Sequence, residues 1–251
     1  MKLNVLDHGY VRLVSYMQPA IEAGFHFDPD VAPSRDWTGD LEIVRNARVS
    51  YDADWRGKNA SVHEEQQNKD EKLIHYLWKN RHTSPFEAMV FTFEVQAPIF
   101  VFRQWHRHRT WSYNEVSARY TELPDLFYVP KPEHVGVQSK NNKQARDLSE
   151  EVTAEAEWFA SDLEEHSVDA LNEYKSQLKY GIPRELARLL LPVNVYSRMF
   201  ATVDLHNLFH FLELRLHSHA QYEIRVYAEA LLKLIEPIVP VAVAAFKEEM
   251  K

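Results

Sequence analysis

No cysteine occurs among the 251 residues of this chain. That absence excludes disulfide bridges, thiolate metal sites, iron–sulfur clusters and a catalytic cysteine nucleophile. Any chemistry must therefore use oxygen and nitrogen side chains or a bound cofactor. Long hydrophobic runs are missing too, since no stretch approaches the roughly 20 apolar residues that cross a bilayer, and residues 1–8 lack the apolar core of a signal peptide. We therefore expect a cytoplasmic protein without a membrane partner.

An excess of basic charge is absent as well. The chain has 29 Lys and Arg against 37 Asp and Glu, a net charge of -8 at pH 7. Nucleic-acid-binding domains usually carry a strong basic footprint, so we expect no nucleic-acid partner. Hydrophobic residues make up 45% and charged residues 26%, which is ordinary for a globular domain. The 13 histidines are more than a chain of this size usually carries.

Polar and aromatic residues are concentrated in residues 107–120, RHRTWSYNEVSARY. Burying so many charges in a core costs several kcal/mol each unless they are paired. Arginine side chains bind phosphates and carboxylates in a bidentate manner. The alternation of arginines with aromatic residues therefore favours a pocket for an anionic, planar ligand such as a nucleotide or a flavin. A structural salt-bridge cluster and a nucleic-acid patch are the alternative interpretations.

Hydrophobic periodicity predicts a single α+β domain over residues 1–251. We expect strands at 11–17, 90–95 and 193–203. We expect helices at 41–47, 73–80 and 98–108, and one or two helices within 141–179. A further helix should begin at residue 204, and one long final helix should begin at residue 220. Residues 84–87, SPFE, have the form of a capping box with proline at the first helical position. The polar run is predicted to start on a helix end and continue into a loop. Residues 26–36 and 54–70 are predicted loop insertions.

Histidines recur on the helix predicted after Asp204. His206, His210, Glu213 and His217 follow offsets of 0, 4, 7 and 11, which place them on one helical face. Two histidines four residues apart are a common chelating pair, so a metal site is one interpretation. A half-buried polar face is the second. The third is that this face lines the same ligand pocket as the polar run, with Arg215 and His219 at its edge.

The motif Arg107-His108-Arg109, followed by seven residues and Ser117, resembles the signature of flavin-dependent thymidylate synthases. Further resemblance covers residues 82–87, 97–101, 103–105, 112–115, 184–192 and 212–223. The similarity extends over roughly residues 38–125 and 180–235. This family is an α+β homotetramer with a small antiparallel sheet, several long helices and active sites between subunits. It uses FAD, NADPH or NADH, and 5,10-methylenetetrahydrofolate to convert dUMP to dTMP, releasing tetrahydrofolate, without a cysteine nucleophile.

The resemblance also implies roles for particular residues of this chain. The expected dUMP-binding residues are Gln104, Arg107, Glu115, Val116, Ser117, Ala118, Arg119, Arg188 and Arg215. The expected FAD-binding residues are Ser50, Ser84, Arg107, His108, Arg109, Glu115, His206, His210 and His219, and His82 is the expected folate-binding residue. Arg215 is the predicted catalytic residue, because a fixed cation beside the uracil ring favours its ionised form. Ser117 is interpreted as a ligand contact, since no general base is evident beside it.

Asp204, His206 and His210 occupy positions where some members of the family carry asparagine or arginine. A carboxylate at position 204 would repel pyrophosphate unless it pairs with a cation or binds ribose hydroxyls. No metal is implied by the resemblance. Two other functions remain as alternatives from the residues themselves. One is a metal-dependent hydrolase that uses the histidine helix, and the other is a nucleotide-binding protein that keeps the fold without turnover.

Overall fold

The computed structural model describes residues 1–17, 39–50, 64–148 and 151–250. The predicted loop insertion at 26–36 lies outside the described residues, as do residues 54–63 of the second predicted insertion. Residues 64–70 of that insertion are not a loop, because helix α2 (Glu64–Lys79) already begins at Glu64. Strongly polar sequence was the reason for predicting a loop there, yet a helix tolerates polar residues on every solvated position.

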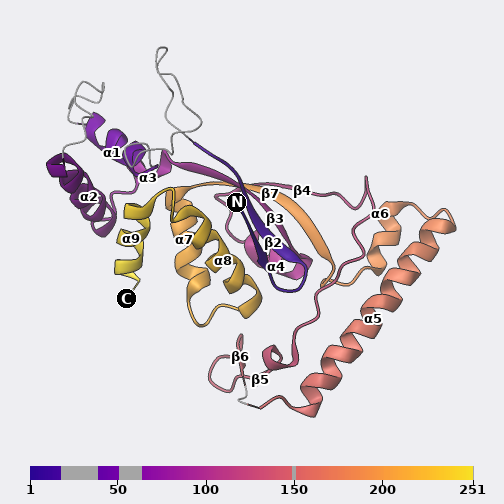
Figure 1. Ribbon diagram of the computed structural model, residues 1–251. Coiled ribbons are helices and arrows are strands. Elements are labelled where there is room, and N and C mark those ends of the chain that lie inside the picture. Colours follow the sequence, from indigo (N-terminus) through magenta and orange to yellow (C-terminus); the bar gives the residue numbers. More distant parts are fainter. Residues whose placement is uncertain (18–38, 51–63, 149–150, 251) are drawn as a thin grey trace.

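A five-stranded antiparallel sheet forms the centre of the fold, in the order β1-β2-β3-β7-β4 (Figure 1). Its strands are β1 (Lys2–Val5), β2 (Gly9–Tyr16), β3 (Val90–Pro98), β7 (Tyr196–Asp204) and β4 (Ser112–Glu115). The three predicted strands are confirmed as β2, β3 and β7. Their apolar residues, such as Phe93 and Val95 at 0% exposure, give the alternation on which sequence prediction depends.

Strand β4 corrects the prediction that the polar run continues into a loop. Residues Ser112–Glu115 pair with β7, with Tyr113 opposite Ala201 and Glu115 opposite Met199. The four residues lack an apolar alternation because three of their side chains are exposed. Backbone pairing with β7 therefore decides their conformation, which local sequence does not reveal.

Helices α4 (Ile99–Trp105), α7 (Leu205–Leu216) and α8 (Tyr222–Ile235) cover one face of the sheet (Figure 1). Buried side chains from these helices and from β3 and β7 form one continuous core. Helix α4 ends at Trp105, three residues before the predicted end at His108. The polar run thus begins in a turn that follows the helix rather than on the helix itself.

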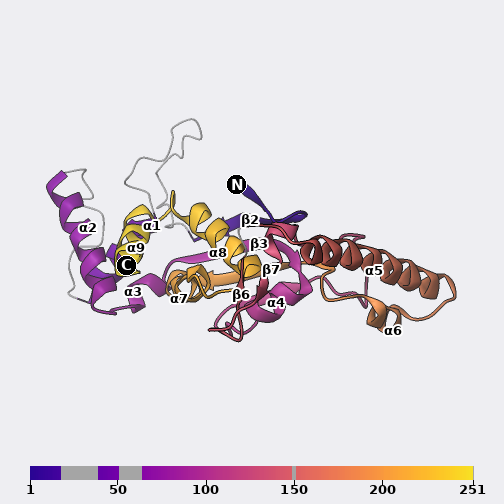
Figure 2. The same cartoon turned by 90° about the horizontal axis from the view of Figure 1, so that it is seen from below.

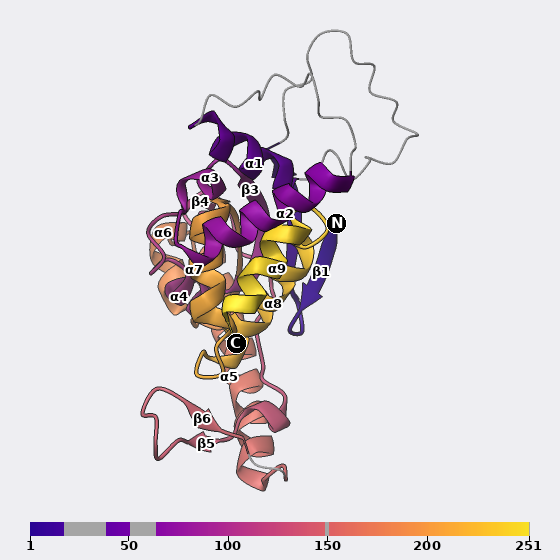
Figure 3. The same ribbon diagram turned by 90° about the vertical axis from the view of Figure 1, so that its left-hand side faces the viewer.

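Helices α1 (Gly39–Val49), α2, α3 (Ser84–Glu87) and α9 (Pro240–Glu249) gather at one end of the sheet. Figure 3 looks onto this end and shows α2 beside α9. Helix α9 corrects the prediction of one long final helix from residue 220. Pro237 lies between α8 and α9, and Pro240 is the first residue of α9; proline lacks the N–H that would continue the backbone ladder of α8.

The capping-box prediction at residues 84–87 is also corrected. The helical turn α3 includes Ser84, so the cap residue is Thr83, which makes no side-chain capping bond. Pro85 then stands one position later than predicted and packs in the core beside Phe86, which is 0% exposed. Burial of Pro85 and Phe86 holds this turn in place instead of a capping box.

A second region projects from the main body (Figures 1 and 2). It contains helix α5 (Ala154–Lys179), helix α6 (Arg184–Ala187), and the 3₁₀ turns η2 (Pro132–His134) and η3 (Arg188–Leu190). A two-stranded hairpin, β5 (Val137–Gln138) with β6 (Arg146–Asp147), lies beside them. The helical prediction over 141–179 is confirmed from residue 154, whereas residues 141–147 belong to the hairpin. Thr153 caps α5 by accepting a hydrogen bond from the N–H of Ala156 at 3.2 Å.

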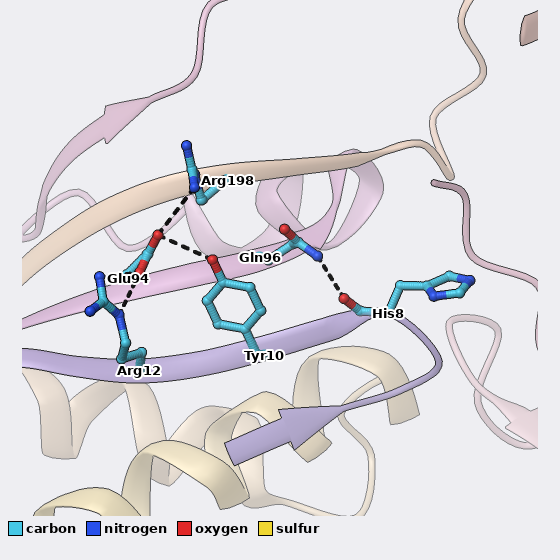
Figure 4. Close-up of polar contacts among 6 residues, drawn as sticks. All are labelled: His8, Tyr10, Arg12, Glu94, Gln96 and Arg198. Carbon is cyan, nitrogen blue, oxygen red and sulfur yellow. Dashed lines mark hydrogen bonds and ion pairs between the residues drawn. The ribbon is translucent and has the colours of Figure 1, made fainter. Parts of the chain in front are cut away.

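The outward face of the sheet carries a charged cluster centred on Glu94 of β3 (Figure 4). Arg12 Nε donates to Glu94 Oε2 at 2.6 Å, Tyr10 Oη donates to Oε1 at 3.1 Å, and Arg198 Nη1 lies 3.5 Å from Oε1. Both arginines thus share one carboxylate that is only 6% exposed.

Within the described residues, no helix is long and apolar enough to cross a bilayer.

Candidate active site

The turn that follows α4 determines which side chains of the Arg107-His108-Arg109 motif are exposed and which is buried. Pro98 starts α4, and Val101, Phe102 and Trp105 are buried against the core. After the helix, the N–H of Arg107 donates to Gln104 O at 3.2 Å and the N–H of His108 donates to Trp105 O at 2.9 Å. These turns leave Arg107 and Arg109 exposed, while His108 is 7% exposed. The motif therefore presents two cations to solvent and one histidine to the core.

Arg215, in the last turn of α7, meets this turn from the other side. Its Nε donates a hydrogen bond to Nε2 of His108 at 3.1 Å, and its Nη2 lies 3.5 Å from the carbonyl oxygen of Gln104. Burial lowers the pKa of His108 to about 4, with the nearby charge of Arg215 as the second cause. Desolvation also lowers the pKa of Arg215 below its usual value. The predicted catalytic arginine thus stands beside a neutral imidazole.

Two residues that were not predicted as site residues form hydrogen bonds with predicted site residues. Gln104 Nε2 donates to Oε1 of Gln221, which precedes α8. Ser197 Oγ donates to Oε1 of Glu115 at 2.7 Å, from β7 to the end of β4. Gln221 lies inside the 212–223 segment on which the family resemblance depends, so that segment was its signal. Nothing in the sequence singles out Ser197, because its partner is 82 residues away.

Asp204 has a structural role as the N-cap residue of α7. Its carboxylate accepts hydrogen bonds from the N–H of Asn207 at 2.9 Å and from Asn207 Nδ2 at 2.6 Å, so Asp204 caps the helix. The neighbouring His206 is half-buried, and its Nδ1 has no hydrogen-bond partner among the described residues. His210, one turn later, is exposed, with its ring centroid 6.1 Å from that of His108.

The predicted four-residue histidine face is shorter than expected. Helix α7 ends at Leu216, and His217 has an extended backbone with ψ 142. Instead of continuing the face, Nδ1 of His217 accepts the backbone N–H of His219 at 3.2 Å, and the two rings lie 4.7 Å apart. Among the described residues, no group of three or more His, Asp or Glu side chains is placed to hold a metal ion. The helical part of the face contains His206, His210 and Glu213.

The remaining predicted dUMP-binding residues form a second group at the far end of β4. Val116 and Ala118 pack with Val195 in a small apolar cluster, and Ser117 Oγ accepts the backbone N–H of Arg119 at 3.3 Å. Ion pairs tie this segment to α6: Arg119 to Glu185 at 3.4 Å, and Arg184 to Glu122 at 3.9 Å.

Arg188 follows α6 and is exposed, and its Nε donates to the carbonyl of Glu185 at 3.3 Å. Helix α6 ends at Ala187, and Arg188 begins the next turn. Within the described chain, no hydrogen bond or ion pair joins Arg188 to Arg215 or its neighbours.

Three other predicted residues lie toward the helical end of the sheet. His82 and Ser84 are exposed in the connection between α2 and α3, with the His82 ring edge-on to Tyr76 at 5.9 Å. Helix α3 packs against α7, which brings this connection to the side of the molecule that carries His206. Ser50 follows α1 and is exposed, with no predicted site residue among its hydrogen-bond partners in the described chain.

The fold and this arrangement define an α+β protein whose cations and histidines converge at the ends of α4 and α7. The family described as thymidylate synthase complementing protein, Thy1, matches residues 35–241. A flavin-dependent thymidylate synthase from Thermus thermophilus is 43% identical over 250 residues, covering 100% of this chain and 80% of that protein. One from Wolbachia pipientis wMel is 42% identical over 252 residues, covering 97% and 75%.

A solved structure shows the same architecture. The crystal structure of the UMP/dUMP methylase PolB from Streptomyces cacaoi bound with 5-Br dUMP has a TM-score of 0.78 at 34% identity, covering 98% of this chain and 97% of that one. The family match and the identities over nearly the whole chain agree. This chain belongs to the family of flavin-dependent thymidylate synthases.

Proposed function

We propose that this protein catalyses the reductive methylation of dUMP to dTMP. The one-carbon donor is 5,10-methylenetetrahydrofolate, which leaves as tetrahydrofolate, and NADPH or NADH is oxidised to supply the two electrons. FAD, when bound, carries those electrons to the nucleotide. The absence of cysteine from the chain supports this route, since no thiolate is present to attack the uracil ring.

The observation that carries the proposal is the position of Arg215. Its guanidinium is half-buried at the end of α7, and within the described residues it forms no ion pair with a carboxylate. A cation held in a partly desolvated place stabilises negative charge more strongly than one in water. Arg215 beside the uracil O2/N3 region would favour the ionised ring and so activate C5. This makes Arg215 the catalytic residue of the proposal.

The donor set around α4 and α7 fits an anionic dinucleotide such as FAD. Arg107 and Arg109 are exposed cations in adjacent turns, and the buried Nδ1 of His206 is an unfilled hydrogen-bonding position. In the proposal these residues hold FAD with Ser50, Ser84, Glu115, His210 and His219. His108 was predicted as a further FAD contact, but it is only 7% exposed, so no direct contact with FAD is assigned to it. His82, near the same side, is the proposed folate contact. Asp204 is occupied as a helix cap, which supports excluding it from the pyrophosphate contacts.

The dUMP phosphate is assigned to arginines through charge-assisted hydrogen bonds. Arg188 and Arg119 are the candidates from the second group, and Arg107 from the first, while Gln104, Glu115, Val116, Ser117 and Ala118 line the nucleotide. Among the described residues, no hydrogen bond or ion pair joins Arg188 to Arg215. We therefore assign the site to the contact between subunits of a homotetramer, where one subunit supplies Arg188 and another supplies Arg215.

The surface around Arg188 supports this assembly. Leu186 is 54% exposed, Leu189 76% and Val193 63%, all within five residues of Arg188. Large apolar side chains gathered on a surface indicate a contact with another protein. A second copy of the chain would bury them and bring another set of site residues to Arg188. Light scattering of the purified protein should give four times the 29.5 kDa chain mass.

Flavin absorbance is the first test, because purified protein should carry FAD or bind added FAD. The second is tritium release from 5-tritiated dUMP, measured with methylenetetrahydrofolate and with NADPH or NADH in parallel. Replacing dUMP by UMP tests whether the enzyme discriminates between deoxyribose and ribose. A folded sample that binds no flavin contradicts the proposal, and dUMP binding without tritium release indicates a nucleotide-binding protein. Hydrolytic activity that disappears when a chelator is added and returns when metal is restored would favour the alternative function, a metal-dependent hydrolase that uses the histidine helix.

A further inference from the structure

In the turn after α4, the backbone of His108 makes two hydrogen bonds and its ring packs against the core. Its backbone N–H donates to Trp105 O at 2.9 Å, and the hydroxyl of Tyr113 donates to its carbonyl oxygen at 2.8 Å. Its ring packs edge-on against Phe211 of α7, with centroids 4.7 Å apart. At 7% exposure the residue has little surface left for a ligand. A role through a neighbouring side chain therefore fits the position of His108 better than direct contact does.

The neighbouring side chain is Arg215. Arginine Nε always carries a hydrogen, so the 3.1 Å contact requires Nε2 of His108 to be the unprotonated acceptor. The other titratable group beside this ring is His210 on α7, while Tyr113 on β4 contacts the backbone carbonyl of His108 and not its ring. Burial keeps the pKa of His108 near 4, so the imidazole is neutral around pH 7. Arg215 is thus fixed by a partner that carries no charge.

The arginines on the outward face of the sheet show the contrasting arrangement. Arg12 and Arg198 are both paired with Glu94, and the carboxylate offsets their charge (Figure 4). A carboxylate at the position of His108 would fix Arg215 equally well but would also neutralise it. The neutral acceptor fixes the guanidinium and leaves its positive charge available to a substrate.

We propose that His108 is a positioning residue, which orients Arg215 through a neutral hydrogen bond so that its uncompensated charge stabilises the ionised uracil ring. This inference rests on the proposed function, in which Arg215 activates dUMP. It goes beyond that function by assigning the orientation of Arg215, and the preservation of its charge, to one side chain. His108 then acts on the reaction without contacting the nucleotide.

The experiment compares His108→Gln, His108→Leu and His108→Asn in the full-length, flavin-loaded protein. Gln can place its side-chain oxygen near the position of Nε2, Leu fills the space without an acceptor, and Asn is too short to reach Arg215. The expected result is a tritium-release rate within about fivefold of wild type for Gln, and a loss of roughly tenfold to hundredfold for Leu and Asn. Flavin absorbance and the dUMP dissociation constant should stay within about threefold. His106→Gln is the matched control, because His106 packs on Phe102 and Tyr113, and the hydrogen bonds that Arg215 makes within the described residues go to His108 and Gln104.

A second measurement follows the ionisation of bound dUMP in flavin-free protein, using ¹⁵N-labelled nucleotide. The N3 pKa of bound dUMP should lie below that of free dUMP in wild type and in His108→Gln, and should rise in His108→Leu and His108→Asn. A merely structural role for His108 would not move this pKa. If His108→Leu fails to fold or to bind flavin, His108→Asn decides the comparison.

The outcomes separate the inference from the proposed function. Wild-type rates and an unchanged N3 pKa in both His108→Leu and His108→Asn overturn the inference while the proposed function stands. Wild-type protein that binds dUMP but releases no tritium overturns the proposed function. In that case the N3 pKa alone decides whether His108 orients Arg215, since this readout needs neither flavin nor turnover.

Discussion

The carboxylate of Asp40 accepts a hydrogen bond from the backbone N–H of Ala242 at 2.9 Å, so a residue in the first turn of α1 caps helix α9. The N–H of Val241 donates to the other carboxylate oxygen, also at 2.9 Å. Ala242 lies 202 residues from Asp40 in the sequence, and this contact joins α1 to α9.

Asp40 makes the stability of this end of the molecule dependent on pH. Burial raises the pKa of Asp40 from 3.8 to about 6. The folded state then binds the proton more tightly than the unfolded state, so this contribution to stability is full below about pH 4 and is lost as pH rises through 6. In Asp40→Asn the group cannot ionise. The free energy of unfolding of wild type, relative to Asp40→Asn, should fall by about 2.5 kcal/mol between pH 4 and pH 7.

Urea unfolding of both proteins across this pH range measures the difference. Other titrating groups are common to the two proteins and cancel. A difference that stays constant with pH would show that Asp40 titrates normally in the folded protein.

Replacing Arg215 by Ala should abolish turnover and leave the fold intact. The guanidinium lies at the end of α7 and is half-buried, so its removal leaves the core residues Phe211 and Leu212 in place. Loss of a fixed charge at the developing anion should lower the tritium-release rate by at least about a hundredfold. Circular dichroism and flavin absorbance serve as controls for folding. Wild-type turnover in this variant would refute the activating role of Arg215.

Arg188→Ala should chiefly weaken dUMP binding. Arg188 is exposed and follows α6, and a charge-assisted hydrogen bond to phosphate contributes about 1.5–3 kcal/mol. The dUMP dissociation constant, measured by calorimetry, should therefore rise roughly tenfold to hundredfold. Arg184→Ala is the matched control, since Arg184 is an exposed arginine four residues earlier that pairs with Glu122. Equal dissociation constants for wild type and Arg188→Ala would reject the phosphate assignment.

A buried ion pair fixes the β5–β6 hairpin to the start of α8. Arg146 Nη2 lies 2.8 Å from Oε1 of Glu223, which also accepts the hydroxyl hydrogen of Tyr128 at 3.0 Å. Glu223 is 1% exposed, so Arg146→Met would leave a buried carboxylate without its counter-charge. The free energy of unfolding should fall by about 3 kcal/mol.

Lys131→Met provides the comparison for this pair. Lys131 and Glu133 are both exposed and 3.9 Å apart, so losing their ion pair should cost less than about 0.5 kcal/mol. Thermal unfolding of the two variants under identical conditions tests the difference. Similar losses in both would contradict a stabilising role for the buried pair.

The contrast between β3 and β4 shows what the sequence predicts about the fold. Strand β3 has buried Phe91, Phe93 and Val95, whose apolar character identifies a strand without further information. Strand β4 is polar, and only its register against β7 makes it a strand. The split between α8 and α9 could have been predicted from Pro237, which follows α8, and from Pro240, which is the first residue of α9, because proline has no N–H to continue a preceding helix. The hairpin at 137–147 has no comparable signal, because its two strands have only two residues each.

The sequence alone determined the chemistry available to this protein, because residue types and short spacings are local properties. It excluded a cysteine nucleophile, predicted a ligand-binding role for the polar run, and provided the resemblance that the family match confirmed. Only the tertiary structure decided which of those residues face one another. His108 is neutral and fixes Arg215 because folding brings together two residues 107 positions apart and removes them from water. Neither long-range contact nor desolvation can be read from local spacing.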